Sequence, residues 1–155
     1  MNPYLEDAAE EIKRVDHLVT VSLKYTRTVD VIRSVIERII SSYECLIETI
    51  LQYCKEKKRI ASVPTNPGLK VTLVQQTLKE DVQLQEYVAF YQLMRRLIRS
   101  PYDKREEYRR HVTMISKLED GQVMNIDIDL LEEYFKKAKE FFKFTHALIG
   151  GKKDE

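Results

Sequence analysis

The sequence predicts a mainly all-α fold: an antiparallel bundle of four to five helices, with a small β-hairpin around residues 112–128. Two observations support this prediction. Apolar residues recur at helical spacing over long stretches, and only four glycines and four prolines interrupt the 155 residues. A chain of this length is expected to bury a core of its own. We therefore interpret residues 1–155 as a single helical domain.

The stretch from Val29 to Cys54 carries the clearest helical pattern. One row of apolar residues follows the alternating four-three spacing of a seam that faces a partner helix. This row contains Ile32, Ile36, Ile39, Tyr43, Leu46, Ile50 and Tyr53, and a second row contains Val35, Ile40, Ile47, Leu51 and Cys54. A helix that is apolar over so much of its circumference is expected inside a core, or in a core plus a subunit interface. We predict a homodimer from this surplus face and from the aromatic face of the last helix. In the alternative interpretation, a single bundle buries the whole apolar surface of this helix and no dimer is needed.

Local sequence signals predict two helix starts and one loop in the N-terminal half. Asn2 followed by Pro3 is typical of a helix start, with a capping residue and then a proline at the first helical position. Thr28 is expected to cap the Val29–Cys54 helix. The segment Ala61–Gly68 is rich in Pro, Asn and Gly and is the clearest predicted loop. It separates the two halves without marking a domain boundary, because neither half alone shows a complete core.

The C-terminal half is more varied. Leu69–Leu78 and the apolar stripe of Tyr87–Ile98 predict helices, and the second of these is expected to stop at Ser100-Pro101. The next segment, Asp103–His111, is highly charged and predicts a short helix.

The residues from Val112 to Ile128 allow two interpretations. The favoured one is a β-hairpin, because β-branched residues and an apolar-polar alternation flank an Asp120-Gly121 turn. The alternative is a continuing helix that ends at Gly121. The last helix is expected to begin at Asp129, which stands three residues before Glu132 as in a capping box, and to end at Gly150-Gly151.

Composition narrows the classes of function. The net charge is +1, so nucleic-acid binding must come from a local patch. No apolar run approaches the ~18 residues that span a membrane, and Met1–Glu11 does not resemble a signal peptide. We therefore expect a cytoplasmic protein that does not enter the membrane. The chain has no CxxC pair, HExxH, phosphate-binding loop or GxSxG motif, so the sequence indicates no metal site and no cofactor.

One local basic patch stands out between residues 95 and 111. Arginine binds phosphate in a bidentate manner, and Tyr102 and Tyr108 can stack on bases. The cations of this patch are Arg95, Arg96, Arg99, Lys104, Arg105, Arg109 and Arg110, against Asp103, Glu106 and Glu107. The competing interpretation is a solvated charged helix with pairs such as Glu106–Arg110 at i, i+4.

Arg105 and His111 form the one candidate catalytic pair. A histidine acting as general acid or base, beside an arginine that stabilises a pentacovalent phosphate, can cleave RNA without metal. Six positions of a straight helix turn by about 240°, so the two side chains would lie on different faces. A helix end near His111, or contributions from two subunits, would bring them together.

The chain resembles the HEPN superfamily in its length, its long early helices and the Arg105-Glu106-Glu107-Tyr108-Arg109-Arg110-His111 element. This element has the form Arg-x5-His, although Glu106 stands where the family usually has a small polar residue. The resemblance implies a homodimer in which two Arg–His pairs meet and cleave RNA. Members of the family act as toxins or are paired with a small nucleotidyltransferase, and others lack catalytic residues and serve as binding modules.

Three hypotheses of function follow. The favoured one is a dimeric, HEPN-like binding module for RNA or nucleotide-bearing partners, which uses Arg95, Arg96, Arg99, Lys104, Arg109 and Arg110. The second is a metal-independent endoribonuclease that uses Arg105 and His111. The third is a helical scaffold without a ligand.

Overall fold

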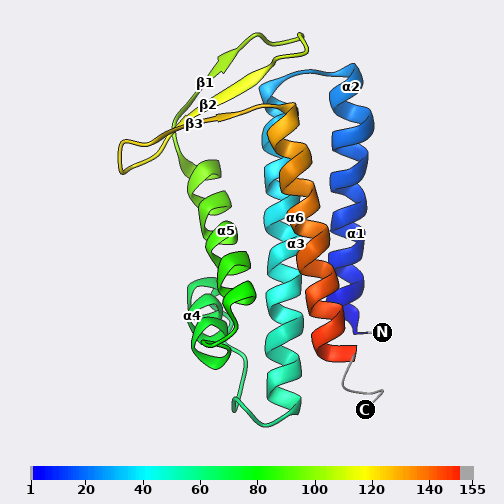
Figure 1. Cartoon of the computed structure of the whole chain (residues 1–155), viewed down its shortest axis with the longest axis vertical. Helices are drawn as coiled ribbons and strands as arrows, with labels where there is room; N and C mark the ends of the chain where they lie inside the picture. Colours follow the sequence, from blue (N-terminus) through cyan, green and yellow to red (C-terminus); the bar gives the residue numbers. More distant parts are fainter. Residues whose placement is uncertain (1, 151–155) are drawn as a thin grey trace.

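The computed structural model describes residues 2–150 and shows a mainly helical protein with a small three-stranded antiparallel sheet. Its helices lie side by side, and the sheet crosses one end of them (Figure 1). In chain order the elements are α1 (Pro3–His17), the π-helical segment η1 (Leu18–Ser22), α2 (Leu23–Tyr25), α3 (Val29–Glu56), α4 (Pro67–Thr77), α5 (Val82–Arg99), β1 (Tyr102–Arg105), β2 (Thr113–Lys117), β3 (Val123–Ile126) and α6 (Ile128–Gly150). Within the described part of the chain, no helix combines the length and the apolar character needed to cross a lipid bilayer.

Helix α3 lies in the middle of the molecule and packs against α1, α4, α5 and α6 (Figure 1). The predicted helix is confirmed, as is its cap, because the Thr28 hydroxyl accepts a hydrogen bond from the Val31 N–H. Ile39, Leu46 and Ile50 are fully buried. Both apolar rows of α3 are covered by the chain's own elements, with Ile40 alone only partly buried. The surplus face that suggested a homodimer is therefore used inside one chain.

An aromatic cluster fills the space between α3, α5 and α6. The Tyr43 ring of α3 lies 4.8 Å from the Phe141 ring of α6, which lies 4.7 Å from the Tyr87 ring of α5. Such ring pairs add stabilisation beyond the burial of their area. The Tyr43 hydroxyl is buried without a hydrogen-bond partner within residues 2–150, and burial raises the pKa of this phenol.

The predicted start of the first helix is confirmed, because the Asn2 side chain accepts hydrogen bonds from the N–H groups of Tyr4 and Leu5. The predicted loop is shifted along the chain. Helix α3 ends at Glu56, and Pro67 and Gly68 belong to the first turn of α4. Asn66 is the reason, since its side chain accepts the Leu69 N–H and lets Pro67 occupy the first helical position.

The hairpin predicted within residues 112–128 is confirmed as β2 and β3, and Gly121 adopts a φ of +88° in its turn. The charged helix predicted over Asp103–His111 is wrong. Tyr102–Arg105 form a third strand, β1, which pairs with β2 from Tyr102 opposite Ser116 to Arg105 opposite Thr113. Pro101 prevents α5 from continuing, and the ladder with β2 then satisfies the backbone.

The start of the last helix differs by two residues from the prediction. The Asp127 side chain accepts the Leu130 N–H at 2.9 Å, so Asp127 and not Asp129 caps α6. Asp129 instead binds Arg110 of the β1–β2 loop. Helix α6 ends at Gly150, and Gly151 lies outside the described residues. Cys45 and Cys54 both lie on α3, the first partly exposed and the second buried.

Candidate nucleic-acid interface

The loop between β1 and β2, residues 106–112, projects over the connection between α2 and α3 (Figure 1). Two of its residues have a left-handed backbone, Glu106 with φ of 53° and Tyr108 with φ of 69°. This conformation is costly for residues with a Cβ, and persists only where the surroundings fix it. Here the Tyr108 N–H donates to the Arg27 carbonyl at 2.6 Å, and the Arg109 N–H donates to the Glu106 carbonyl at 3.2 Å. The loop is therefore held in one shape against the α2–α3 connection.

Glu107 fastens this loop to the start of α3. Its Oε2 accepts the Val29 N–H at 2.9 Å, across 78 positions of sequence. A carboxylate at a helix N-terminus satisfies an otherwise unpaired donor and interacts favourably with the helix dipole. Lys104 Nζ lies 4.0 Å from Glu107 Oε1 and 3.8 Å from Asp30 Oδ1, which links β1 to the same helix start. Loop and helix thus support one another.

The structure divides the predicted basic patch into two groups. Arg95, Arg96 and Arg99 lie on α5 and face the start of α4. Lys104, Arg105, Arg109 and Arg110 lie on the β1–β2 hairpin. The split follows from the end of α5 at Arg99: a helical stripe cannot continue into an antiparallel hairpin.

Ion pairs distinguish the cations of the hairpin. Arg110 donates to Asp129 Oδ1 at 2.9 Å, and this hydrogen bond raises the pKa of the guanidinium above its usual value. Lys104 is shared between Asp30 and Glu107. Within residues 2–150, neither Arg105 nor Arg109 forms an ion pair, and both are exposed. These two arginines keep their donors available for an external anion.

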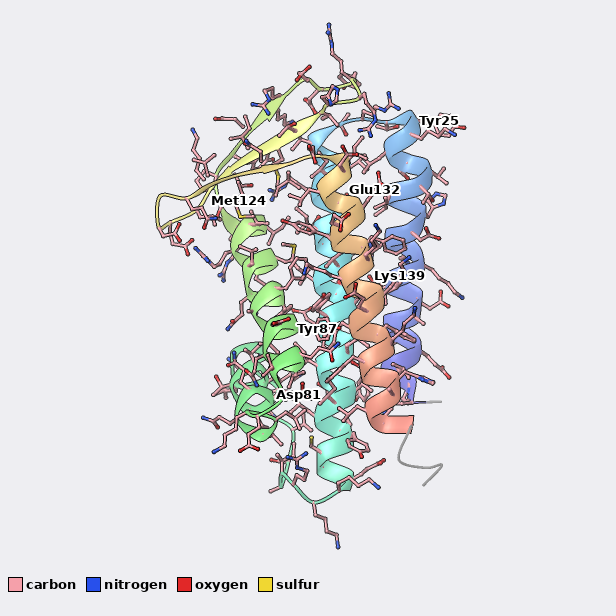
Figure 2. The ribbon with its side chains drawn as sticks, viewed as in Figure 1. Tyr25, Asp81, Tyr87, Met124, Glu132 and Lys139 are labelled. Atoms are coloured by element: carbon pink, nitrogen blue, oxygen red, sulfur yellow. The ribbon has the colours of Figure 1, made fainter. Side chains whose placement is uncertain are left out.

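Two tyrosines are exposed at this end of the molecule. Tyr108 is 77% exposed on the hairpin loop, and Tyr25 is 79% exposed at the end of α2. Figure 2 shows Tyr25 pointing away from the helices. The Tyr108–Arg27 backbone hydrogen bond joins the hairpin loop to the α2–α3 connection, two residues after Tyr25. We call Tyr25, Arg105, Tyr108 and Arg109 the tip surface.

The tip surface differs from the set of aromatic residues that the sequence suggested. Tyr102 is half-buried beneath the Arg33 guanidinium, which lies 4.2 Å from its ring centroid, so this ring is already covered. Tyr25 was missed. The signal that could have found it is the weak helix pattern of Lys24–Thr28, where an aromatic residue occupies a break between helices.

Arg105 and His111 belong to the same hairpin, the first at the end of β1 and the second in the β1–β2 loop. Arg105 ends β1 opposite Thr113, and His111 is exposed in the loop two residues before Thr113, whose hydroxyl donates to the His111 carbonyl at 2.8 Å. The helical phase that would have separated the two side chains does not apply, because no helix contains them. Glu106, exposed beside Arg105, adds a negative charge at this position.

The fold and the site define a mainly helical protein that presents exposed tyrosines and arginines at one end. Comparison with known proteins found no family model, no curated protein and no solved structure that matches the chain. Among residues 2–150, no group of three or more His, Cys, Asp or Glu side chains is arranged to hold a metal ion.

Proposed function

We propose that this protein is a HEPN-like helical-bundle module that binds single-stranded RNA through the tip surface and acts as a homodimer. The observation that carries the RNA proposal is the exposure of two tyrosine rings, Tyr25 at the end of α2 and Tyr108 on the β1–β2 loop, which is fixed to the α2–α3 connection. A ring that is mostly exposed contributes little to the core and offers a face on which a base can stack. Arg105 and Arg109 lie close in sequence to one ring and supply the charges that phosphates need.

Single-stranded RNA fits this surface better than a duplex does. Bases must be unpaired to present their faces to tyrosines, and sequence-tolerant stacking needs no deep groove. The backbone of the loop is held by Glu107 and by the Tyr108–Arg27 hydrogen bond. A loop fixed before binding loses less conformational entropy when the ligand arrives.

The test is fluorescence anisotropy with a labelled single-stranded RNA of mixed sequence. Tyr25→Ala and Tyr108→Ala are each expected to weaken binding about tenfold, since one stacked base contributes about 1–3 kcal/mol. Tyr4→Ala is the matched control, because Tyr4 is a partly exposed tyrosine at the start of α1, away from the tip surface. Equal affinity of the wild type and both tip variants, or no salt-sensitive binding at all, would contradict the proposal.

A second candidate function is metal-independent RNA cleavage by Arg105 and His111. The observation that favours it is that Arg105 ends β1 while His111 is exposed in the β1–β2 loop, which also carries Tyr108, a ring on which a base can stack. His111 would take the proton of the attacking 2′-hydroxyl and return it to the 5′-oxygen as the P–O5′ bond breaks, and Arg105 would stabilise the negative charge on the phosphoryl oxygens. Cleavage that resists EDTA and disappears in His111→Ala supports this candidate. Cleavage that the substitution leaves unchanged eliminates the pair.

The homodimer proposal rests on the outer surface of α1 and α6. Ala9, Ile12 and Phe142 line an apolar groove of about 240 Å³ there, between the stems of Lys139 and Lys143. Helix α1 also carries the exposed carboxylates of Glu6 and Glu10, and Glu6 stands one helical turn before Ala9. A two-fold axis through the groove would set the acidic α1 of one copy against the basic α6 of the other.

Light scattering after size exclusion tests this interface. Phe142→Glu is expected to convert a dimer into a monomer, because a carboxylate would enter the apolar contact without a partner. Val82→Glu is the control, since Val82 is exposed at the start of α5, outside this groove. A wild type that stays monomeric at micromolar concentration would contradict the dimer and leave the RNA proposal intact.

A further inference from the structure

A groove lies between α4 and α5, apart from the tip surface. Its volume is about 700 Å³. Asn66, Pro67 and Val71 line one side, and Tyr91, Arg95 and Arg99 line the other. The volume lies within the range of about 300–1,000 Å³ that is usual for small-molecule sites. A groove of this size holds more than a single ion.

Two arginines in this groove have unused donors. Arg95 and Arg99 stand one helical turn apart on α5, so their Cβ atoms lie about 5–6 Å from each other. Within residues 2–150, no carboxylate lies within ion-pairing distance of either one. The Tyr91 hydroxyl accepts a hydrogen bond from Arg95 Nη1 at 3.4 Å, and no other group of the described residues does so. Two guanidinium groups at this spacing can grip one phosphate from two sides.

Arg96 has a different role, although it lines the same groove. It donates to Glu119 at 2.7 Å and to Asp120 at 3.0 Å, both in the β2–β3 turn. These hydrogen bonds raise the pKa of Arg96 above its usual value. Its charge is therefore balanced, and it holds the turn against α5. The positive charge left for a ligand comes from Arg95 and Arg99.

Tyr91 lines the groove, but only 2% of this residue is exposed. Its hydroxyl donates to Glu44 Oε2 at 2.8 Å. Burial, and to a lesser degree the contact with Glu44, raises the pKa of Tyr91 to about 12. This group therefore stays a neutral phenol, and its proton is donated to Glu44. The apolar side chains that line the groove and keep exposed surface are Pro67, Ala89 and Leu93, and these can contact an uncharged part of a ligand.

We propose that the α4–α5 groove binds a small molecule that carries a phosphate group. Arg95 and Arg99 hold the phosphate, and Pro67, Ala89 and Leu93 contact the body of the molecule. Inorganic phosphate would leave most of the 700 Å³ filled with water. A phosphate that carries a flat or apolar group would fill more of the groove and remove its apolar lining from water. The site shares no residue with the tip surface and does not depend on RNA binding.

Isothermal titration calorimetry with phenyl phosphate and with inorganic phosphate tests the proposal. Phenyl phosphate is expected to bind the wild type several-fold more tightly than inorganic phosphate. The Arg95→Gln/Arg99→Gln double variant is expected to weaken phenyl phosphate about tenfold or more, because two charged hydrogen-bonding groups are lost. Arg38→Gln, on the exposed surface of α3, is the control that keeps wild-type affinity. Circular dichroism confirms that each variant is folded.

Two outcomes would overturn the proposal. One is phenyl phosphate that fails to bind the wild type or binds the double variant equally well. The other is a double variant that loses single-stranded RNA affinity while phenyl phosphate has no effect on the wild type, which would make the groove part of an RNA path. An Arg105→Gln/Arg109→Gln variant separates the two sites, since it is expected to lose RNA affinity and keep phenyl phosphate binding.

Discussion

Helix α3 and the β1–β2 loop are stabilised in opposite ways. The apolar side chains of α3, such as Ile39 and Leu46, are fully buried among four other helices. The loop buries little and is held by a few hydrogen bonds, chiefly from Glu107 to Val29 and from Tyr108 to Arg27. The first region supplies the stability of the fold, and the second supplies exposed groups in a fixed shape. Binding surfaces on a rigid framework commonly divide the work in this way.

The largest expected effect is on α3. Leu46→Ala is expected to lower the free energy of unfolding by about 2–5 kcal/mol, because it removes a fully buried side chain and leaves a cavity. Urea denaturation followed by circular dichroism measures this change. Val82→Ala, at an exposed position, should stay within about 0.5 kcal/mol of the wild type. Equal losses for the two variants would contradict the central place given to α3.

A smaller effect is expected where the two regions meet. Glu107→Ala removes the carboxylate that accepts the Val29 N–H, and losses of helix caps cost about 1 kcal/mol. The same variant should weaken RNA binding, since the loop is no longer fastened to α3. Glu106→Ala is the matched control, a neighbouring exposed glutamate. If Glu106→Ala and Glu107→Ala lose the same stability, the link between loop and helix is not the one described.

A still smaller effect, of opposite sign, is expected at Tyr108. Its φ of 69° is unfavourable for a tyrosine, and glycine adopts this conformation freely. The gain is partly offset by the greater flexibility of glycine in the unfolded chain. Tyr108→Gly should therefore raise the free energy of unfolding by about 0.5 kcal/mol while RNA affinity falls. A large loss of stability in urea denaturation would show that the ring packs on the fold.

The smallest effect concerns the β2–β3 turn and its dependence on pH. The Gln122 N–H, and then Arg96, lower the pKa of the Asp120 carboxyl below its usual value. A group with a lowered folded-state pKa stabilises the protein fully above its unfolded pKa, near 4, and loses this contribution as pH falls through the folded value. Asp120→Asn should therefore flatten the acid side of the stability curve, below about pH 4. An unchanged profile would contradict this assignment.

The sequence predicted the parts of the fold that depend on local patterns. The α3 helix follows from its apolar spacing, the caps at Asn2 and Thr28 follow from residue type, and the β2–β3 turn follows from Asp120-Gly121. The prediction of a helix over Asp103–His111 was wrong because it relied on helix propensity, which is high for lysine, arginine and glutamate. What decides this segment is pairing with β2 and the contact from Glu107 to Val29, which are distant in sequence.

The candidate site was only partly predictable for the same reason. Arg105, Arg109 and Tyr108 were identified from a run of basic and aromatic residues. Their separation from Arg95 and Arg99 depends on the turn of the chain at Pro101. The contribution of Tyr25 depends on the contact between the β1–β2 loop and the α2–α3 connection, which exists only in the folded protein. The dimer inferred from α3 likewise assumed a face that the chain's own helices turn out to cover.

The salt dependence of RNA binding tests the central claim most directly. For single strands, the slope of log K against log salt concentration is about −0.7 for each phosphate contact. If Arg105 and Arg109 each contact a phosphate, their double replacement by glutamine should make the slope less steep by about 1.4. A slope that stays the same in the double variant would contradict the assignment of RNA binding to the tip surface.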